Sequence, residues 1–304
     1  MEISGNVKRS VVTIGNFDGV HAGHAALLDA AREIAQNRGL ASCLVTFWPH
    51  PATILRPKNL HRPLAEREER ARLLAARGFD RIIELPFDEN MAALSPEEFV
   101  TRCLLPLRMA VLVMGHDFAL GRNASGDFAH LAELGKKHGF EVCQVAAHIV
   151  GGEVVSSTRA RRALADGAVE EAARLLGRPW SICGEVIHGE GRGTGLGFPT
   201  ANIAPPQKML PGSGVYATIA KASGREWPAI TNIGNNPTFN GKNLTIETFL
   251  LTGGENLYGR ELCLDFIGHI RGEIHFSGPD ELAAQIEKDI RKAREILRAN
   301  ALPH

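Results

Sequence analysis

Hydrophobic and polar positions in the first half of the chain alternate between two patterns. Short apolar runs rich in β-branched residues recur, and stretches with the apolar periodicity of a helix lie between them. Near-continuous apolar strands separated by helices predict a doubly wound parallel sheet with helices on both faces. We expect strands at 11–15, 42–47, 81–87, 110–115 and 140–146, and helices at 22–38, 64–77, 95–105 (opened by a capping box of Ser95 and Glu98) and 128–138.

The pattern changes after about residue 180, beyond a short helical segment at 158–176. Strand-like runs then follow one another with Gly, Pro and Asn turns between them, which predicts a small antiparallel β-barrel. We expect two domains, residues 1–180 and 181–304. The barrel strands are expected at 181–189, 214–222, 226–234, 244–251 and 261–271, and a closing helix at 279–300 should pack on the barrel through Leu282, Ile286, Ile290 and Leu297.

The composition is that of an ordinary globular protein. Among 304 residues, 34 Lys and Arg balance 34 Asp and Glu, so gross charge favours neither a nucleic-acid nor a membrane partner. No run approaches the ~20 apolar residues of a membrane span. The cysteines are widely spread and form no CxxC pair, which predicts reduced thiols in a cytoplasmic protein; they are Cys43, Cys103, Cys143, Cys183 and Cys263.

The segment GNFDGVHAGH (15–24) joins the first expected strand to the first expected helix. His21 and His24 share one face of that helix, because residues i and i+3 are neighbours. Gly23 lies between them and lets a ligand approach the backbone closely. A Gly-rich turn that leads into a helix N-terminus is an anion site, here at the carboxyl edge of the sheet. The chain has no P-loop motif, and the Gly-rich run at 189–197 does not open a helix.

Taken alone, the two histidines are also compatible with a helix cap or a zinc-binding pair, although no nearby Cys or Glu completes a zinc set. The segment resembles the HxGH signature of nucleotidyltransferases. The longer string resembles the FMN adenylyltransferase half of bacterial bifunctional riboflavin kinase/FAD synthetases. The resemblance implies that His21 and His24 are catalytic, and it implies nucleotide contacts for Gly15, Asn16, Phe17, Asp18 and Gly23.

Two further stretches match the same family. GHDFALGRNASGD (115–127) resembles its flavin-side loop, which implies that Asp117 and Phe118 lie near the flavin. SSTRAR (156–161) resembles its SSTxxR pattern, in which hydroxyls and an arginine hold phosphate oxygens. The implied reaction is attack of the FMN phosphate on the α-phosphorus of ATP, giving FAD and pyrophosphate without a covalent enzyme intermediate. The implied phosphate-binding residues are Ser156, Ser157, Thr158 and Arg161.

The stretch GLGFPTANI (195–203) places Thr200 and Asn202 two residues apart, so that in an extended chain their side chains point the same way. Their oxygens are hard ligands suited to Mg²⁺. Without a family match, a flexible Gly-rich turn is the favoured interpretation. GFPTAN resembles the characteristic string of riboflavin kinases, as do GVYAT, NIGNNPTF and ETFLL…LYGREL further on. This implies that Thr200 and Asn202 hold Mg²⁺ and that Gly197 and Pro199 contact ATP.

The same match singles out Glu247 on the expected strand TIETFLL. Thr245, Glu247 and Phe249 share one face of that strand. A strand glutamate in such surroundings is usually a solvated edge residue, whereas the resemblance implies a general base that draws the proton from the riboflavin 5′-hydroxyl as it attacks the γ-phosphate of ATP. The chain departs from the family pattern at Thr194 and Gly195, where an Arg-Thr pair is frequent, and at Asn236, where an arginine is common. It also departs at Trp48, where an acidic residue is usual.

The leading hypothesis is therefore an enzyme that phosphorylates riboflavin to FMN and adenylylates FMN to FAD, with ATP and Mg²⁺ in both steps. A second hypothesis keeps the HxGH chemistry but uses another phosphate acceptor, with a non-catalytic flavin-binding barrel. A third is a flavin- or nucleotide-sensing module without turnover. No pattern in the chain sets its oligomeric state.

Overall fold

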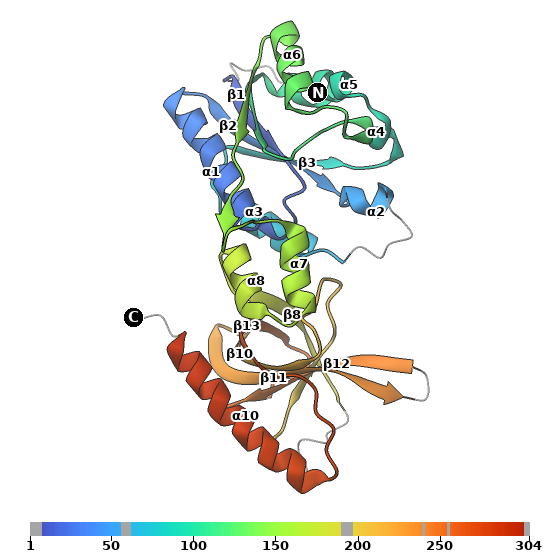
Figure 1. The fold of residues 1–304 in the computed structure, drawn as a ribbon, viewed down its shortest axis with the longest axis vertical. Helices are drawn as coiled ribbons and strands as arrows, with labels where there is room; N and C mark the ends of the chain where they lie inside the picture. Colours follow the sequence, from blue (N-terminus) through green and yellow to red (C-terminus); the bar gives the residue numbers. More distant parts are fainter. Residues whose placement is uncertain (1–7, 56–61, 190–196, 239–240, 254–255, 301–304) are drawn as a thin grey trace. The chain divides into compact units, whose positions relative to one another are not determined.

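The structure, a computed structural model, describes residues 8–55, 62–189, 197–238, 241–253 and 256–300, with the backbone alone for 235–238 and 241–243. The chain divides into two compact units, residues 1–157 and 158–304 (Figure 1).

The first unit is built on a five-stranded parallel sheet in the order β3-β2-β1-β4-β5. In the centre, Val12 pairs with Cys43 on one side and with Leu112 on the other. The doubly wound plan predicted from the apolar runs is confirmed. The strands are β1 (Ser10–Ile14), β2 (Ala41–Trp48), β3 (Arg81–Pro86), β4 (Met109–Gly115) and β5 (Glu141–Val145).

Helices lie in the four predicted regions, and the pattern did not predict the short helices at 51–55 and 89–93 or the hairpin at 149–154. Ser95 and Glu98 form the expected capping box, and the helix they open continues through a π-helical turn. The helical segments are η1 (Asp18–Val20), α1 (Ala22–Asn37), α2 (Pro51–Leu55), α3 (Arg67–Ala75), α4 (Glu89–Ala93), α5 (Pro96–Phe99), η2 (Val100–Leu104), η3 (Leu105–Leu107), η4 (Arg122–Ala124) and α6 (Phe128–His138); a hairpin of β6 (Ile149–Val150) and β7 (Glu153–Val154) follows.

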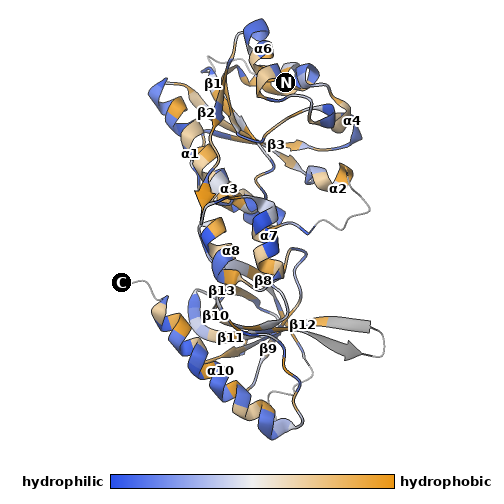
Figure 2. Cartoon of the chain, in the orientation of Figure 1, coloured by the Kyte–Doolittle hydropathy of each residue, from blue (hydrophilic) through white to orange (hydrophobic). Residues whose placement is uncertain are grey.

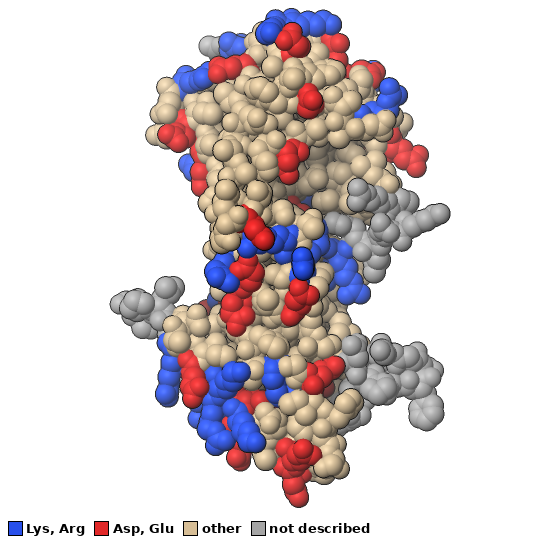
Figure 3. Space-filling model, viewed as in Figure 1, with Lys and Arg blue, Asp and Glu red and all other residues tan. Residues whose placement is uncertain are grey.

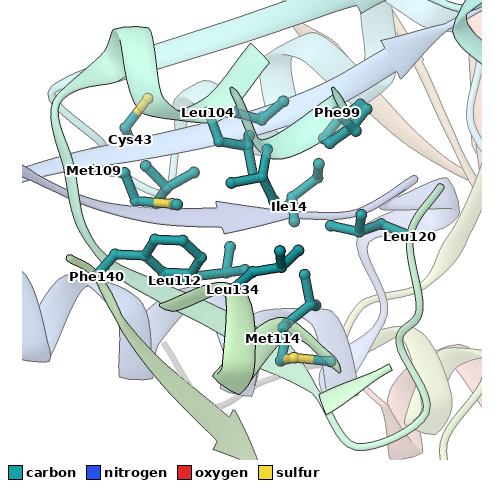
Figure 4. Packing of buried hydrophobic residues seen from close by; sticks show 14 of the residues in the cluster. Ile14, Cys43, Phe99, Leu104, Met109, Leu112, Met114, Leu120, Leu134 and Phe140 are labelled. Carbon is teal, nitrogen blue, oxygen red and sulfur yellow. The ribbon is translucent and has the colours of Figure 1, made fainter. Parts of the chain in front are cut away.

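Each face of the sheet carries its own hydrophobic core. Successive strand residues point to opposite faces. On one face Ile14 and Met114 meet Phe99 and Leu134 from the helices, as Figure 4 shows. On the other face Val11, Leu44 and Val113 pack against Leu28 of α1 and Leu74 of α3. Both faces are therefore covered, which leaves the carboxyl edge of the sheet as the place for a ligand site.

The second unit is a closed barrel in the order β10-β11-β12-β9-β8-β13. The predicted barrel is confirmed, with one strand that the pattern did not predict: β9 is only three residues long and closes the barrel between β8 and β12. The strands are β8 (Trp180–Ile187), β9 (Ala201–Ile203), β10 (Gly214–Ala222), β11 (Arg225–Thr238), β12 (Gly241–Leu250) and β13 (Glu261–Arg271).

The segment 158–176 forms two helices, α7 (Ser157–Ala165) and α8 (Val169–Leu176), separated by Gly167 at φ +73°. Both helices are hydrogen-bonded to other parts of the barrel unit. The Glu170 carboxylate accepts a hydrogen bond from the His269 N–H (2.9 Å), and the Leu164 carbonyl accepts one from the Gly212 N–H (2.8 Å). The division between the compact units falls after Ser157, the first residue of α7, whereas the sequence pattern placed a boundary at residue 180.

The C-terminal helix α10 (Pro279–Ala299) runs along β10, β11 and β13 (Figure 1). Apolar residues recur along it between polar ones (Figure 2), and Ile290 and Leu297 pack on the barrel as predicted. All four predicted residues, Leu282 and Ile286 included, are partly buried. The most buried positions are Ala293 and Asp289. The charged Asp289 can be buried because it forms an ion pair with Arg271 (2.9 Å).

The expectation of reduced thiols is wrong for two of the cysteines. Cys183 and Cys263 form a disulfide, because the antiparallel register of β8 and β13 places them directly opposite each other. Their sequence separation of 80 residues hides this pairing in the linear chain. Cys43, Cys103 and Cys143 carry free thiols.

Charged side chains of both signs are interspersed on the face shown in Figure 3. Arg159 and Arg174, for example, both pair with Glu171. Within the described ranges, no helix combines the length and apolar character needed to cross a membrane.

Candidate active sites

The loop after β1 is held in an unusual backbone conformation. Phe17, Gly19 and Val20 have positive φ angles of 48°, 75° and 42°. A branched residue such as Val20 rarely adopts this left-handed region, and strain of this kind concentrates at functional sites. Nothing in the local sequence except Gly19 signals it.

Two buried charged side chains support the loop. The Asp18 carboxylate accepts hydrogen bonds from the N–H groups of Leu64 (2.8 Å) and Ala65 (3.3 Å). Arg70, on α3, donates to the carbonyls of Asn16 (3.2 Å) and Phe47 (2.8 Å) at the carboxyl ends of β1 and β2. Asp18 therefore anchors the loop to the residues that precede α3. Sequence reasoning missed Arg70, because a charged residue in a helical pattern is ordinarily assigned to the surface.

His21 and His24 are stacked, with ring centroids 3.5 Å apart and an angle of 13° between the planes. His21 is the N-cap of α1, and its Nδ1 accepts a hydrogen bond from the His24 N–H (3.1 Å). His21 therefore caps the helix and stacks on His24 at the same time, so the helix-cap interpretation and the paired imidazoles do not exclude each other. Among the described residues, no group of three His, Cys, Asp or Glu side chains could hold a metal ion, so a zinc pair lacks further ligands.

His24 is buried against Phe17, whose ring meets it edge-on at 5.3 Å. Its Nδ1 is buried without a hydrogen-bond partner. Burial lowers the pKa of His24 well below its ordinary value, and the neighbouring His21 lowers it further. His24 is therefore neutral at pH 7.

The glycines of this segment make room for side chains. A Cβ built on Gly23 would lie 3.2 Å from the His21 ring and 3.5 Å from the Val155 carbonyl oxygen, and one on Gly15 would lie 3.0 Å from the Phe17 ring. Gly23 therefore seats the His21 ring, which is a more specific reason for a glycine than backbone access.

The SSTRAR stretch reaches the same loop. The Ser157 hydroxyl donates to the Asp18 carbonyl (3.2 Å), across 139 residues of chain. Ser156 precedes α7, while Thr158 (exposed) and Arg161 (partly buried) lie within it. The structure thus brings the start of this stretch to the HxGH loop, and the phosphate contacts of the four residues stay predictions.

The Gly-rich loop 115–127 begins at the end of β4, which is the neighbour of β1 in the sheet. Asp117 is exposed at this edge, whereas Phe118 packs on the core. Gly121 and Gly126 are needed for close packing, because a Cβ on either would lie within 3.0 Å of Pro96. The glycines therefore shape the loop, and the exposed side chain of Asp117 lies at this edge.

In the barrel, Glu247 lies between two asparagines. It is directly opposite Asn202 of β9 and directly opposite Asn232 of β11. Opposite residues on neighbouring strands have Cβ atoms about 5 Å apart on one face of the sheet. Glu247 is therefore not an edge residue, and the side chain of Asn232, which sequence reasoning missed, completes the row.

The other predicted barrel residues lie on β12 or in the segment that leads into β9. Ile246 and Thr248 are buried on the opposite face of β12, as the alternation predicted. Thr200 lies two residues before Asn202, and Phe198 meets Phe249 edge-on at 5.6 Å. Gly197 and Pro199 are exposed. Thr194, Gly195 and the side chain of Asn236 lie outside the described residues.

Comparison with known proteins gives a consistent result for both halves. The sequence model of the FAD synthetase family matches residues 4–159, and that of the riboflavin kinase family matches residues 176–297. The Bifunctional riboflavin kinase/FMN adenylyltransferase of Escherichia coli strain K12 is 38% identical over 287 residues, which cover 94% of this chain and 92% of that protein. The protein of the same name from Bacillus subtilis strain 168 is 36% identical over 295 residues, with coverage of 94% and 92%.

A crystal structure of a protein named macrolide-efflux protein, from Streptococcus pneumoniae, matches with a TM-score of 0.88 at 29% identity and covers 96% of both chains. Fold and family matches together define a two-domain transferase of flavin-cofactor synthesis. The chain belongs to the family of bifunctional riboflavin kinase/FMN adenylyltransferases. A nucleotidyltransferase for another phosphate acceptor, with a non-catalytic barrel, is therefore not favoured.

Proposed function

We propose that the two activities of this family, phosphorylation of riboflavin to FMN and adenylylation of FMN to FAD, use separate residues in the two units of this chain. ATP is the co-substrate of both reactions. For the barrel, the proposal rests on the strand register, which sets Glu247 beside Asn202. For the first unit, it rests on the stacked imidazoles of His21 and His24.

In the first unit, an FMN phosphate oxygen attacks the α-phosphorus of ATP, and the bond to pyrophosphate breaks. Because the His21 Nδ1 accepts the His24 N–H, the proton of a neutral His21 ring lies on Nε2, which can donate to a phosphate oxygen. Donors fixed in advance stabilise the charge that builds on those oxygens. We assign phosphate contacts to Ser156, Ser157, Thr158 and Arg161, and flavin contacts to Asp117 and Phe118. We assign nucleotide contacts to Gly15, Asn16, Gly23 and the backbone of Phe17, whose side chain is fully buried.

Asp18 contributes to nucleotide binding by supporting the loop that carries the other residues. Its carboxylate is occupied by the N–H groups of Leu64 and Ala65, and its carbonyl accepts from the Ser157 hydroxyl. We propose that it positions the nucleotide-binding backbone and the Ser157 side chain together.

In the barrel, the Glu247 carboxylate accepts the proton of the riboflavin 5′-hydroxyl while the hydroxyl oxygen attacks the γ-phosphorus of ATP and ADP leaves. A general base must reach the proton it removes, and Glu247 lies on a strand with a neighbour on each side, so its backbone is fixed. We place Gly197 and Pro199 beside the ATP phosphates.

The donors near Glu247 fit a magnesium ion. The Thr200 hydroxyl and the Asn202 amide are hard oxygen ligands, and Asn202 lies in register with Glu247. Thr200 and Asn202 would hold the ion, which when bound would neutralise negative charge on the ATP phosphates. We also propose a cytoplasmic location, because both reactions consume ATP. The cysteines do not support this location, since Cys183 and Cys263 form a disulfide.

Product analysis with the full chain tests the proposal. With riboflavin, ATP and magnesium chloride the protein should form FMN and FAD. E247Q should lose FMN formation by about 100-fold or more and keep FAD formation from supplied FMN. H21N keeps an N-cap residue but removes the imidazole, and it should show the reverse pattern, with an FAD loss of about 100-fold.

Glu226, another barrel-surface glutamate, gives the matched control, and E226Q should keep both activities. A folded E247Q protein that loses both activities would contradict two separate sites. Undiminished FMN formation by E247Q would contradict its role as the base.

A further inference from the structure

A second carboxylate reaches the face of the barrel that carries Glu247. Gly234 lies two residues after Asn232 on β11, so both residues face the same side of the strand. A Cβ built on Gly234 would lie 3.0 Å from Glu273 Oε1 and 3.3 Å from Asn232 Nδ2. The Glu273 carboxylate therefore lies in the space that Gly234 leaves, next to the asparagine that faces Glu247.

The backbone that carries Glu273 is anchored from α10. Asp289 is 4% exposed and accepts hydrogen bonds from Arg271 Nε (2.9 and 3.1 Å) and from the Gln285 amide (2.8 Å). The same guanidinium donates through Nη1 to the carbonyl of Gly272 (2.9 Å), one residue before Glu273. The exposed Glu273 therefore lies only two residues after Arg271, which the buried Asp289 holds in place.

Asn202, Glu247 and Asn232 form a row across β9, β12 and β11, and Glu273 lies at the Asn232 end of it, away from the proposed magnesium ligands. Asn202 is opposite Glu247 on one side, and Asn232 is opposite Glu247 on the other, with Gly234 diagonal to Glu247. Diagonal neighbours of this kind are about 7–8 Å apart. Glu273 therefore faces a part of the bound substrate other than the phosphates of ATP.

We propose that Glu273 is a substrate-binding residue of the kinase site, whose carboxylate accepts hydrogen bonds from hydroxyls of the ribityl chain of riboflavin. The inference rests on the proposed role of Glu247. With the terminal hydroxyl of that chain at Glu247, its remaining hydroxyls lead away along the face of the sheet. A carboxylate is a strong acceptor for hydroxyl donors.

Steady-state kinetics of E273Q in the full chain tests this. The KM for riboflavin should rise about 10-fold or more with little change in kcat, and FAD formation from FMN should be unchanged. G234A puts a methyl group 3.0 Å from the Glu273 carboxylate and should reproduce the effect. E287Q, at an exposed position of α10, is the matched control and should behave as the wild type.

Riboflavin analogues that lack single ribityl hydroxyls identify the contact. The wild type should lose about 10-fold or more in kcat/KM with at least one analogue, and E273Q should lose little with that same analogue. Equal penalties in both proteins, an unchanged KM in E273Q, or a fall in kcat alone would overturn the proposal. Retention of FMN formation by E247Q would instead overturn the function on which it rests.

Discussion

Gly189 leaves the space that the side-chain amide of Asn202 occupies. A Cβ on Gly189 would lie 2.1 Å from Asn202 Nδ2 and 2.7 Å from its Oδ1, distances that real atoms do not show. We expect Gly189→Ala to displace the amide and to lower FMN formation by about 10-fold or more, because a small misplacement of a positioning group can cost that much.

The measurement is the rate of FMN formation, with FAD formation from FMN as the internal control. Gly278→Ala is the matched substitution, because a Cβ there meets nothing within 4 Å. Equal rates in the two variants would show that the Asn202 amide can move without consequence.

The buried His24 makes the stability of the first unit dependent on pH. Its folded-state pKa is depressed, so below the unfolded-state pKa of about 6.5 the unfolded chain binds more protons than the folded one. Its contribution is fully present above that pH and is lost as the pH falls towards the folded-state pKa, by up to about 1.4 kcal/mol per pH unit. Urea unfolding at pH 7.5, 6.5 and 5.5 should show a steeper loss for the wild type than for H24N. An NMR titration that finds His24 charged at pH 6.5 would contradict the argument.

Removal of the Asp18 carboxylate should destabilise the first unit. D18A leaves the N–H groups of Leu64 and Ala65, which are 0% and 2% exposed, without this acceptor, at a cost of about 2–5 kcal/mol. D18N keeps one acceptor oxygen and should cost less. Urea unfolding measures both, with D29A at an exposed ion pair as the control. A D18A protein as stable as D29A would be inconsistent with the anchoring role.

The disulfide between β8 and β13 should be detectable chemically and should stabilise the barrel. Thiol titration of the unfolded, unreduced chain should find the free thiols of Cys43, Cys103 and Cys143 alone. Reduction should lower the free energy of unfolding of the barrel by about 2–4 kcal/mol. The double variant C183S/C263S should be insensitive to reductant. Titration of all the cysteines without reductant would refute the pairing.

A chain of buried hydroxyls links three barrel strands. Thr231 Oγ1 lies 2.9 Å from Thr218 Oγ1 and 3.0 Å from Thr248 Oγ1, and all three residues are fully buried. T231V has nearly the same shape but removes the central hydroxyl, so we expect a loss of about 1–3 kcal/mol in the free energy of unfolding. T231S retains the hydroxyl and should keep the hydrogen bonds, although it loses a methyl group. If T231V is at least as stable as T231S, the hydroxyl chain contributes little.

Local periodicity predicted the longer strands and helices of this chain, but not the short elements α2, α4, β6 and β7. The apolar runs of β1 and β4 and the alternation around Glu247 predicted strands and their buried faces. The three-residue strand β9 escaped, because a run that short shows no alternation, and Gly167 ended a helix that its neighbours would have continued.

The sites depend on contacts that no local pattern encodes. The resemblance singled out His21, His24 and Glu247, but Arg70 touches the HxGH loop from a helix 54 residues away. The pairing of Cys183 with Cys263 follows from strand register across 80 residues. Register and packing exist only once the chain has folded, so sequence reasoning could place these residues in elements and not beside their partners.

The position of α7 bears on any attempt to obtain one activity from a shortened chain. Thr158 and Arg161, assigned to adenylyl transfer, belong to the compact unit that contains the barrel, and Glu170 of the next helix is bonded to β13. A cut after residue 157 would remove Thr158 and Arg161, two of the proposed phosphate ligands, from the first fragment. A cut after residue 180 would remove Glu170, whose carboxylate accepts a hydrogen bond from β13. A gene truncated at either point should yield a protein that has lost part of what its surviving half requires.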